Sequence, residues 1–334
     1  MEIRQPYLLF LGEAHDELAA KSANGIVQWR PEACVGQLRL DGCKVDLGVP
    51  DMTIAEAAEA GARTLVLGIA VAGGAVPDAW AEPFSEALER GLDIANVLHR
   101  RLGDLPGLAD KAAETGRRLL EVRLPQQSFN VGTGAKRSGK RLLTVGTDCS
   151  VGKMYASLAI EKEMRARSLK ATFKATGQSG ILIVGRGVPV DAVVADFIAG
   201  AIEWLTPDAE PDHWDVIEGQ GSLFHPSFAG VSLGLLHGAQ PDALVLCHEP
   251  TRTHMRALPH QPLPEIAACI ETNLDAARLT NADVEMVGIA VNTSALERAA
   301  AEDLLASYEE TYGLPAVDPV ATSVGPIVDR LTAG

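Results

Sequence analysis

The stretch GTDCSVGKMYAS, from Gly146 to Ser157, holds the residues whose types and spacing point most clearly to chemistry. It sets two glycines around a short loop and then places a lysine at the start of a predicted helix. In a P-loop, backbone N–H groups surround the phosphate oxygens and the lysine contacts the outer phosphates. The sequence therefore predicts a phosphate-binding loop made of Gly146, Thr147, Asp148, Cys149, Ser150, Val151, Gly152, Lys153 and Met154.

Met154 is the main departure from the usual pattern GxxxxGK[ST], because it stands where a hydroxyl normally holds magnesium. A thioether is a poor ligand for that hard ion, so phosphoryl transfer is disfavoured. Binding of a phosphorylated cofactor whose phosphates do not react, such as coenzyme A, is favoured instead. Asp148 and Glu218 could still supply carboxylates, so magnesium is possible but is not expected to be essential, and no metal ligands are assigned.

Three further side chains are candidate catalytic residues. Glu218 ends the apolar run DVIE and could act as a base with a raised pKa if it is desolvated, or could be a structural carboxylate. Lys174 could contact a carboxylate or carbonyl, or could be a solvated lysine at a strand end. His225 follows the glutamate loop directly, although a lone histidine is more often a hydrogen-bonded structural residue.

The segment LCHEPTRTHMR, 246–256, supplies a candidate substrate-binding residue, Arg252. Loops at the carboxyl edge of a parallel sheet bind ligands, and a guanidinium there could hold a carboxylate through two hydrogen bonds; a plain surface arginine is the alternative. The glycines of GIAVAGG, 68–74, suggest a secondary ligand site. Cys149 is a possible acyl carrier, but its backbone amide is the more expected contribution.

Alternating apolar and amphipathic segments must position these residues. In the first half, strands are expected at 7–12 and 64–70 and helices at 53–62 and 83–91. The second half repeats the alternation from RLLTVG onward, so both halves are expected to be α/β with mostly parallel sheets. The first half is Rossmann-like but lacks a clear GxGxxG, which leaves a NAD role poorly supported. The expected domains are 1–124 and 141–334, joined by a linker at 125–140.

Composition limits the partners of this chain. Among 334 residues, 44 acidic side chains against 29 basic ones give a formal charge of -15, which disfavours nucleic acid. Five cysteines without a CxxC pair suggest a reduced, cytoplasmic protein. No signal peptide and no apolar run of membrane-spanning length are apparent, so we expect no membrane partner. Alanine-rich helices leave room for a homo-oligomer.

The phosphate loop resembles that of dethiobiotin synthetase, which has the same extended form, GTDxxVGKT. FKATGQSG, 173–180, resembles that enzyme's lysine and following serine-glycine turn, and DVIEGQGSL, 215–223, resembles its VEGAGG segment. The resemblance implies a P-loop NTPase-like second domain, with Lys174 facing the substrate and Glu218 near the phosphates and metal. It also makes Ser179 a candidate substrate-binding residue.

A wider resemblance joins both halves. Segments 11–32, 45–62, 68–80, 91–104 and 218–250 are similar to a family long catalogued only as a domain of unknown function, whose members are associated with D-glutamate N-acetyltransferase activity. This resemblance implies acetyl transfer from acetyl-CoA to the amine of D-glutamate. The alternatives are a magnesium- and ATP-dependent ligase or kinase in the style of dethiobiotin synthetase, and a nucleotide-sensing protein that uses its first half.

Overall fold

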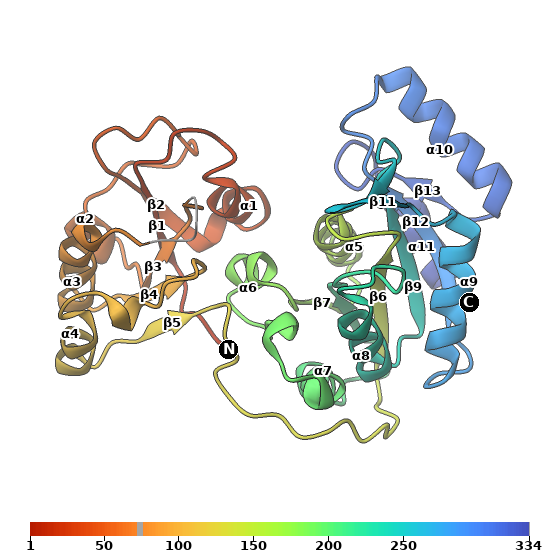
Figure 1. Cartoon of the computed structure of the whole chain (residues 1–334), viewed down its shortest axis with the longest axis horizontal. Helices are drawn as coiled ribbons and strands as arrows, with labels where there is room; N and C mark the ends of the chain where they lie inside the picture. Colours follow the sequence, from red (N-terminus) through yellow and green to blue (C-terminus); the bar gives the residue numbers. More distant parts are fainter. Residues whose placement is uncertain (72–75, 334) are drawn as a thin grey trace. The chain divides into compact units, whose positions relative to one another are not determined.

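The computed structural model describes residues 1–71 and 76–333, which form two compact units (Figure 1). Unit 1 comprises residues 1–127 and 178–192, and unit 2 comprises residues 128–177 and 193–334. Each unit is built on a parallel sheet with helices, so the predicted α/β class with a Rossmann-like first half and a P-loop second half is confirmed. The domain boundaries expected from the sequence, 1–124 and 141–334 with a linker at 125–140, remain a prediction.

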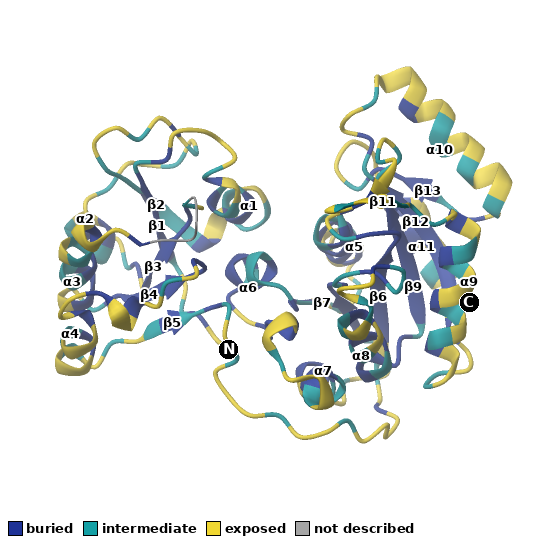
Figure 2. Cartoon of the chain, viewed as in Figure 1, coloured by how far each residue is buried: buried dark blue, intermediate teal, exposed yellow. Residues whose placement is uncertain are grey.

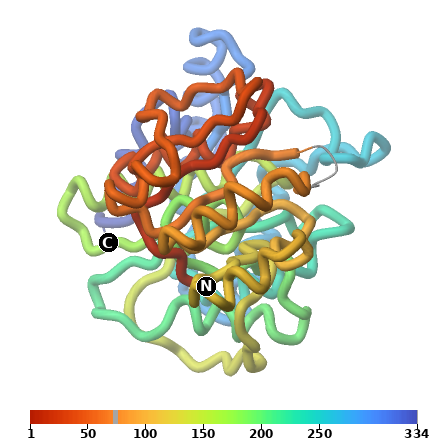
Figure 3. The backbone as a smooth tube through the Cα atoms, turned by 90° about the vertical axis from the view of Figure 1, so that its left-hand side faces the viewer, coloured from red at the N-terminus to blue at the C-terminus, as the bar shows by residue number. Residues whose placement is uncertain are grey.

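Unit 1 contains a five-stranded sheet in the order β2-β1-β3-β4-β5. Its strands are β1 (Tyr7–Gly12), β2 (Cys34–Arg39), β3 (Thr64–Leu67), β4 (Asp93–Asn96) and β5 (Leu119–Glu121). Its helices include α1 (Lys21–Trp29), α2 (Ile54–Glu59), α3 (Ala81–Glu89) and α4 (Leu108–Thr115). Helices α2, α3 and α4 lie side by side along this unit (Figure 1 and Figure 3).

Local sequence explains these elements. Every residue of β1 is buried, as expected for an apolar strand inside a parallel sheet. Helix α2 begins at a capping box in which Thr53 and Glu56 satisfy each other's backbone N–H groups. The rings of Phe10, Trp80 and Phe84 meet edge to face and fill the space between β1 and α3.

Unit 1 also includes a segment that comes from far along the chain. Helix α6 (Gln178–Val184) packs on α1, and the residues after it pair with the N-terminus. Ile3 N–H donates to Gly185 O at 2.6 Å, and Gly187 N–H donates to Met1 O at 3.2 Å. The chain therefore enters unit 2, returns to unit 1 for residues 178–192, and goes back to unit 2.

Unit 2 contains a six-stranded parallel sheet in the order β13-β12-β9-β6-β8-β7. The strands are β6 (Lys140–Gly146), β7 (Ala171–Lys174), β8 (Trp214–Ile217), β9 (Ala243–His248), β12 (Glu285–Val291) and β13 (Ala316–Val317). The short strands β10 (His254–Met255) and β11 (Leu258–Pro262) form an antiparallel hairpin. The buried sheet residues appear dark blue between helices with yellow exposed faces in Figure 2.

The helices of unit 2 form two groups. Helix α5 (Lys153–Ala166) packs with α11 (Gly325–Thr332), whereas α7 (Ile198–Leu205), α8 (Ala229–Ala239) and α9 (Ile266–Arg278) pack in series. Helix α10 (Arg298–Tyr312) lies near β13 and buries only Ala301. Among the helices of residues 1–71 and 76–333, none has the length and apolar character needed to cross a bilayer.

Residues 128–139, within the predicted linker, are fixed to unit 2. The Glu203 carboxylate accepts hydrogen bonds from the backbone N–H groups of Thr133 and Gly134, at 2.9 and 2.8 Å. Farther along, the buried Arg137 donates to Gly238 O at 2.7 Å. Hydrogen bonds to residues of α7 and α8 therefore hold this part of the chain in place before β6 begins.

Candidate active site

Residues 147–152 of the predicted phosphate loop connect the carboxyl end of β6 to the first turn of α5. Ser150 (φ 55°) and Gly152 (φ 102°) adopt left-handed conformations, which turn the backbone sharply before the helix begins. No side chain caps the N-terminus of α5, so its first-turn N–H groups are left for a ligand. This arrangement suits an anionic group at the positive end of a helix dipole.

Lys153 folds back over the loop. Its side chain is buried, and Nζ donates a hydrogen bond to Asp148 O at 2.7 Å. A Cβ at residue 146 would lie 2.9 Å from that Nζ, so Gly146 leaves the room the ammonium needs. Burial lowers the pKa of Lys153, an energetic cost that an anionic ligand in the loop would relieve.

Asp148 holds the loop to the segment that follows β9. Its fully buried carboxylate accepts hydrogen bonds from Arg252 Nη1 at 2.7 Å, from Cys149 N–H at 2.6 Å and from Arg256 N–H at 2.6 Å. Arg252 Nη1 also donates to Cys149 O at 2.7 Å, and Nε donates to Glu249. Arg252 thus stabilises the phosphate loop, and its expected contact with substrate stays a prediction.

Glu218 follows β8 directly and is buried at the same carboxyl edge as the loop. One carboxylate oxygen accepts hydrogen bonds from the N–H groups of Thr176 and Gly177, both at 3.0 Å. Desolvation outweighs these bonds and the nearby charge of Lys153, and raises the pKa of Glu218 to about 7. A carboxylate with that pKa is suited to accept a proton near neutral pH.

Gly219 lets the Glu218 strand approach β6. Its N–H donates to Thr144 Oγ1 at 3.0 Å, and a Cβ at residue 219 would lie 1.7 Å from Thr144 O. No side chain fits there without moving one of the two strands.

We expect Gly219→Ala to destabilise the protein by more than about 2 kcal/mol, because the added methyl group forces β6 and β8 apart. Gly230→Ala, in α8 where a Cβ would meet nothing within 4 Å, is the matched control and should be neutral or slightly stabilising. Urea unfolding of both variants measures the difference. Equal midpoints for the two variants would show that the strands tolerate the methyl group.

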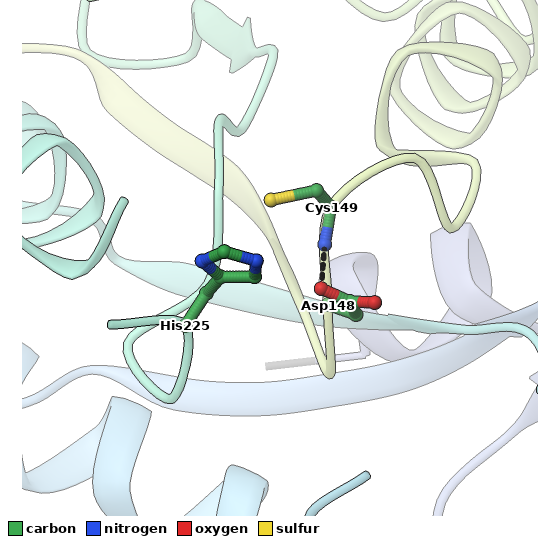
Figure 4. A group of neighbouring side chains, drawn as sticks. All are labelled: Asp148, Cys149 and His225. Atoms are coloured by element: carbon green, nitrogen blue, oxygen red, sulfur yellow. Dashed lines mark hydrogen bonds between the residues drawn. The ribbon is translucent and has the colours of Figure 1, made fainter. Parts of the chain in front are cut away.

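His225 lies beside the phosphate loop. One ligand atom each from Asp148, Cys149 and His225 lies within 4.8 Å of the others (Figure 4). However, Nδ1 of His225 accepts from Ser227 N–H at 3.2 Å, and Nε2 contacts Arg256 O at 3.1 Å. Since Asp148 is also engaged by Arg252, a cation here would have to displace existing contacts. The proposed catalytic role of His225 stays a prediction.

Two other predicted residues have defined surroundings. The Lys174 ammonium forms an ion pair with Asp215 at 3.2 Å, so a contact with substrate would require that pair to open. Ser179 lies in α6 of unit 1. Both roles stay predictions. The suggested secondary site at 68–74 lies partly outside the described residues, which omit 72–75.

His248, at the end of β9, is a buried contact of the loop that was not among the assigned site residues. Its Nδ1 lies 3.1 Å from Thr147 Oγ1, and burial lowers the pKa of His248 to about 4. The imidazole is therefore neutral at physiological pH and can pair with the hydroxyl. Its place at the end of an apolar strand was the signal in the sequence.

An apolar pocket of about 240 Å³ opens beside the phosphate loop. Its walls come from the start of α5, the end of β12 and the loop after β13: Val151, Gly152, Tyr155, Ala290, Asn292, Ser294, Asp318, Pro319, Val320 and Ala321. Asp318 holds this last loop by accepting hydrogen bonds from Thr293, Val320 and Ala321 N–H groups. The pocket can receive a flat group attached to phosphates held by the loop.

A parallel sheet with a glycine-bounded loop, a buried lysine and an uncapped helix after its central strand defines a P-loop α/β protein. The chain belongs to the DUF1611 family: the P-loop domain of that family matches residues 130–328, and its Rossmann-like N-terminal domain matches residues 38–125. The family resemblance seen in the sequence motifs is therefore confirmed.

Known relatives extend over the whole chain. A protein from Tritonibacter scottomollicae, named D-glutamate N-acetyltransferase, is 55% identical over 99% of this chain and 99% of its own length. A protein of the same name from Pseudoalteromonas sp. is 52% identical over 99% of this chain and 100% of its own length. The crystal structure of a DUF1611 family protein from Anabaena variabilis is 31% identical, covers 99% of this chain and 100% of its own, and superimposes with a TM-score of 0.82.

Proposed function

We propose that this protein is a D-glutamate N-acetyltransferase that takes its acetyl group from acetyl-CoA. The observation that carries the proposal is the 55% and 52% identity, over essentially the full length, to two proteins of that name. At such identity the residues around the phosphate loop are expected to serve the same reaction. The predicted cytoplasmic location belongs to the same proposal.

The loop and its neighbouring pocket suit the nucleotide end of coenzyme A. The uncapped N–H groups of α5 and the Lys153 ammonium offer donors to phosphate oxygens. The pocket of about 240 Å³ is smaller than the roughly 300–1,000 Å³ typical of sites for whole drug-sized ligands. It is therefore a fitting place for one ring system, with Asn292 and Ser294 as polar groups at its wall.

Acetyl-CoA would supply an activated acyl group, so the protein must chiefly provide a neutral acceptor amine and a stabilised transition state. Glu218 is the proposed base: its pKa of about 7 lets the carboxylate accept the proton released when the amine forms the new N–C bond. The sulfur of coenzyme A leaves with the electron pair of the broken C–S bond. Lys174 and His225 remain proposed catalytic contacts, and Arg252 and Ser179 remain proposed substrate contacts.

The same site gives little support to magnesium-dependent phosphoryl transfer. Met154 offers a thioether where a P-loop enzyme has its magnesium hydroxyl, and the Asp148 carboxylate already pairs with Arg252 at 2.7 Å. Glu218 is a further carboxylate near the loop, and its raised pKa disfavours the charged form that a cation would need. We therefore propose that magnesium is not essential.

Thermal-shift titration tests which ligand the loop binds, because a ligand of the folded state raises the melting temperature by mass action. We expect acetyl-CoA to raise it, with the same shift in EDTA. ATP with magnesium and NAD, as matched additions, should give smaller shifts. A shift with ATP that needs magnesium, and none with millimolar acetyl-CoA, would favour the ligase or kinase alternative.

A further inference from the structure

Unit 1 contains a pocket of about 390 Å³ at the carboxyl ends of β4 and β5. It lies wholly within unit 1, because its remaining wall comes from the returning segment 178–192. The lining residues are Leu98, His99, Arg101, Glu121, Arg123, Leu124, Asp191 and Ala192. The carboxyl edge of a parallel sheet is where such folds bind ligands, and the volume is within the roughly 300–1,000 Å³ range of small-molecule sites.

The pocket wall carries two arginines, Arg101 and Arg123, together with two carboxylates, Glu121 and Asp191. Arg101 is exposed, and its guanidinium has no hydrogen bond or ion pair with any residue in 1–71 or 76–333. The adjacent Arg100, by contrast, has partners within the protein: it forms an ion pair with Asp78 at 2.8 Å and donates a hydrogen bond to Val76 O at 2.6 Å. Arg101 is therefore available to a ligand, whereas Arg100 stabilises the fold.

Arg123 is the second cation, and its position is fixed. Its Nη1 donates to Gln178 Oε1, from the first residue of α6. Its other guanidinium nitrogens have no partner among the residues that the structure describes, and Arg123 lines the pocket together with Arg101. The returning segment thus orients the Arg123 guanidinium. Both guanidinium groups, those of Arg101 and Arg123, keep N–H donors for anionic groups of a ligand.

The carboxylate at the pocket wall does not neutralise these cations through direct contact. Glu121 accepts hydrogen bonds from Leu102 N–H and from Asn96 Nδ2, both at 2.7 Å. Burial raises the pKa of Glu121, and its hydrogen bonds and the nearby charge of Arg101 oppose that rise. Asp191 is exposed at the rim and could receive an ammonium group.

We propose that this unit 1 pocket binds a small dicarboxylate, with Arg101 and Arg123 each holding one carboxylate. Guanidinium groups bind carboxylates through paired N–H donors, and two of them lining one pocket favour a ligand with two acidic ends. The occupant is either the acidic amino acid that accepts the acetyl group or a dicarboxylate that regulates the protein. Only the first of these cases rests on the proposed function.

Calorimetric titration of the full-length protein with glutarate tests the site without any turnover. We expect wild-type protein to bind glutarate, and Arg101→Ala and Arg123→Ala each to weaken binding about 10- to 100-fold, the value of a charge-assisted hydrogen bond. Arg90→Ala is the matched control, since Arg90 is an exposed unit 1 arginine paired with Glu86 at 3.1 Å. Unchanged melting curves establish that the variants are folded, and Arg101→Glu provides a second variant at a position without partners.

Kinetics then separate the two sources of ligand. If the pocket holds the acceptor, both arginine variants raise the KM for D-glutamate and change kcat little. If it holds a regulator, they weaken glutarate binding to the same extent and leave that KM unchanged. The inference is overturned if wild-type protein shows no glutarate binding at millimolar concentration, if Arg101→Glu binds it equally well, or if the pocket binds inorganic phosphate in place of dicarboxylates. Absence of acetyl transfer by wild-type protein would instead refute the proposed function and leave the glutarate result standing.

Discussion

Replacing Glu218 by glutamine is expected to lower kcat about 100- to 10,000-fold, the usual contribution of a general base. Glutamine retains the shape of the side chain and an oxygen that can accept from the N–H groups of Thr176 and Gly177. It removes only the ability to take a proton from the acceptor amine. Glu218 is buried, and desolvation raises its pKa. We therefore expect the lower kcat to come from a slower proton transfer and not from unfolding of the protein.

The raised pKa of Glu218 also predicts how the rate and the stability change with pH. Glu218 must be ionised to act as a base, so the kcat/KM of wild-type protein should rise with pH and level off above about 7. Stability should follow the opposite trend. The folded state keeps the Glu218 proton to about pH 7 while the unfolded chain releases it at the lower, ordinary glutamate pKa, so the free energy of unfolding declines as pH rises between those values.

Steady-state rates and thermal melts between pH 5 and 9 measure both effects. Glu218→Gln should lose the pH-dependent rise in rate, and its stability relative to wild type should improve toward high pH. Glu285→Gln, at an exposed residue at the amino end of β12, is the matched control and should leave rate and profile unchanged. A Glu218→Gln variant with near wild-type kcat would exclude this carboxylate as the base.

Lys153→Ala is expected to weaken acetyl-CoA binding about 10- to 100-fold, because it removes the charged donor closest to the loop's anion site. The buried ammonium makes a hydrogen bond to Asp148 O at 2.7 Å, so it is already positioned inside the loop. Fluorescence or calorimetric titration gives the dissociation constants. The KM for acetyl-CoA should rise, while direct binding of glutarate should be unaffected.

Two variants on the same helix serve as comparisons. Lys162→Ala removes an exposed lysine of α5 and should leave acetyl-CoA affinity unchanged. Met154→Thr supplies the hydroxyl that P-loop enzymes use for magnesium, and we expect it to gain a magnesium-dependent thermal shift with ATP. If Lys153→Ala and Lys162→Ala bind acetyl-CoA equally well, the phosphate loop is not the site of its phosphates.

The sequence predicted the strand before the loop 147–152 and the helix after it, and phosphate binding by that loop stays a prediction. Expected strands at RLLTVG and YLLFLG correspond to β6 and β1, because continuous apolar runs between glycines or turns carry a strong local signal. The fold class and the burial of Glu218 at a strand end follow from the same pattern. Parallel strands bring their carboxyl ends to one edge, which is why Glu218 lies near Lys153 although the two are far apart in sequence.

Other features depend on long-range contacts that have no local signal. The return of residues 178–192 to unit 1 results from pairing with Met1 and Ile3, which the sequence of α6 does not reveal. The partners of Arg252 and Lys174 are Asp148 and Asp215, and neither ion pair is evident from residue type. The unit 1 pocket was missed because Arg101 and Arg123 lie in separate loops and are joined only by the sheet edge.

D-glutamate-dependent release of the coenzyme A thiol tests the central claim most directly. Purified protein with acetyl-CoA should release thiol when D-glutamate is added, form N-acetyl-D-glutamate in equal amount, and keep its rate in excess EDTA. L-glutamate serves as the stereochemical control. Thiol release that does not depend on D-glutamate, or ADP formation from ATP that requires magnesium in its place, would contradict the assignment.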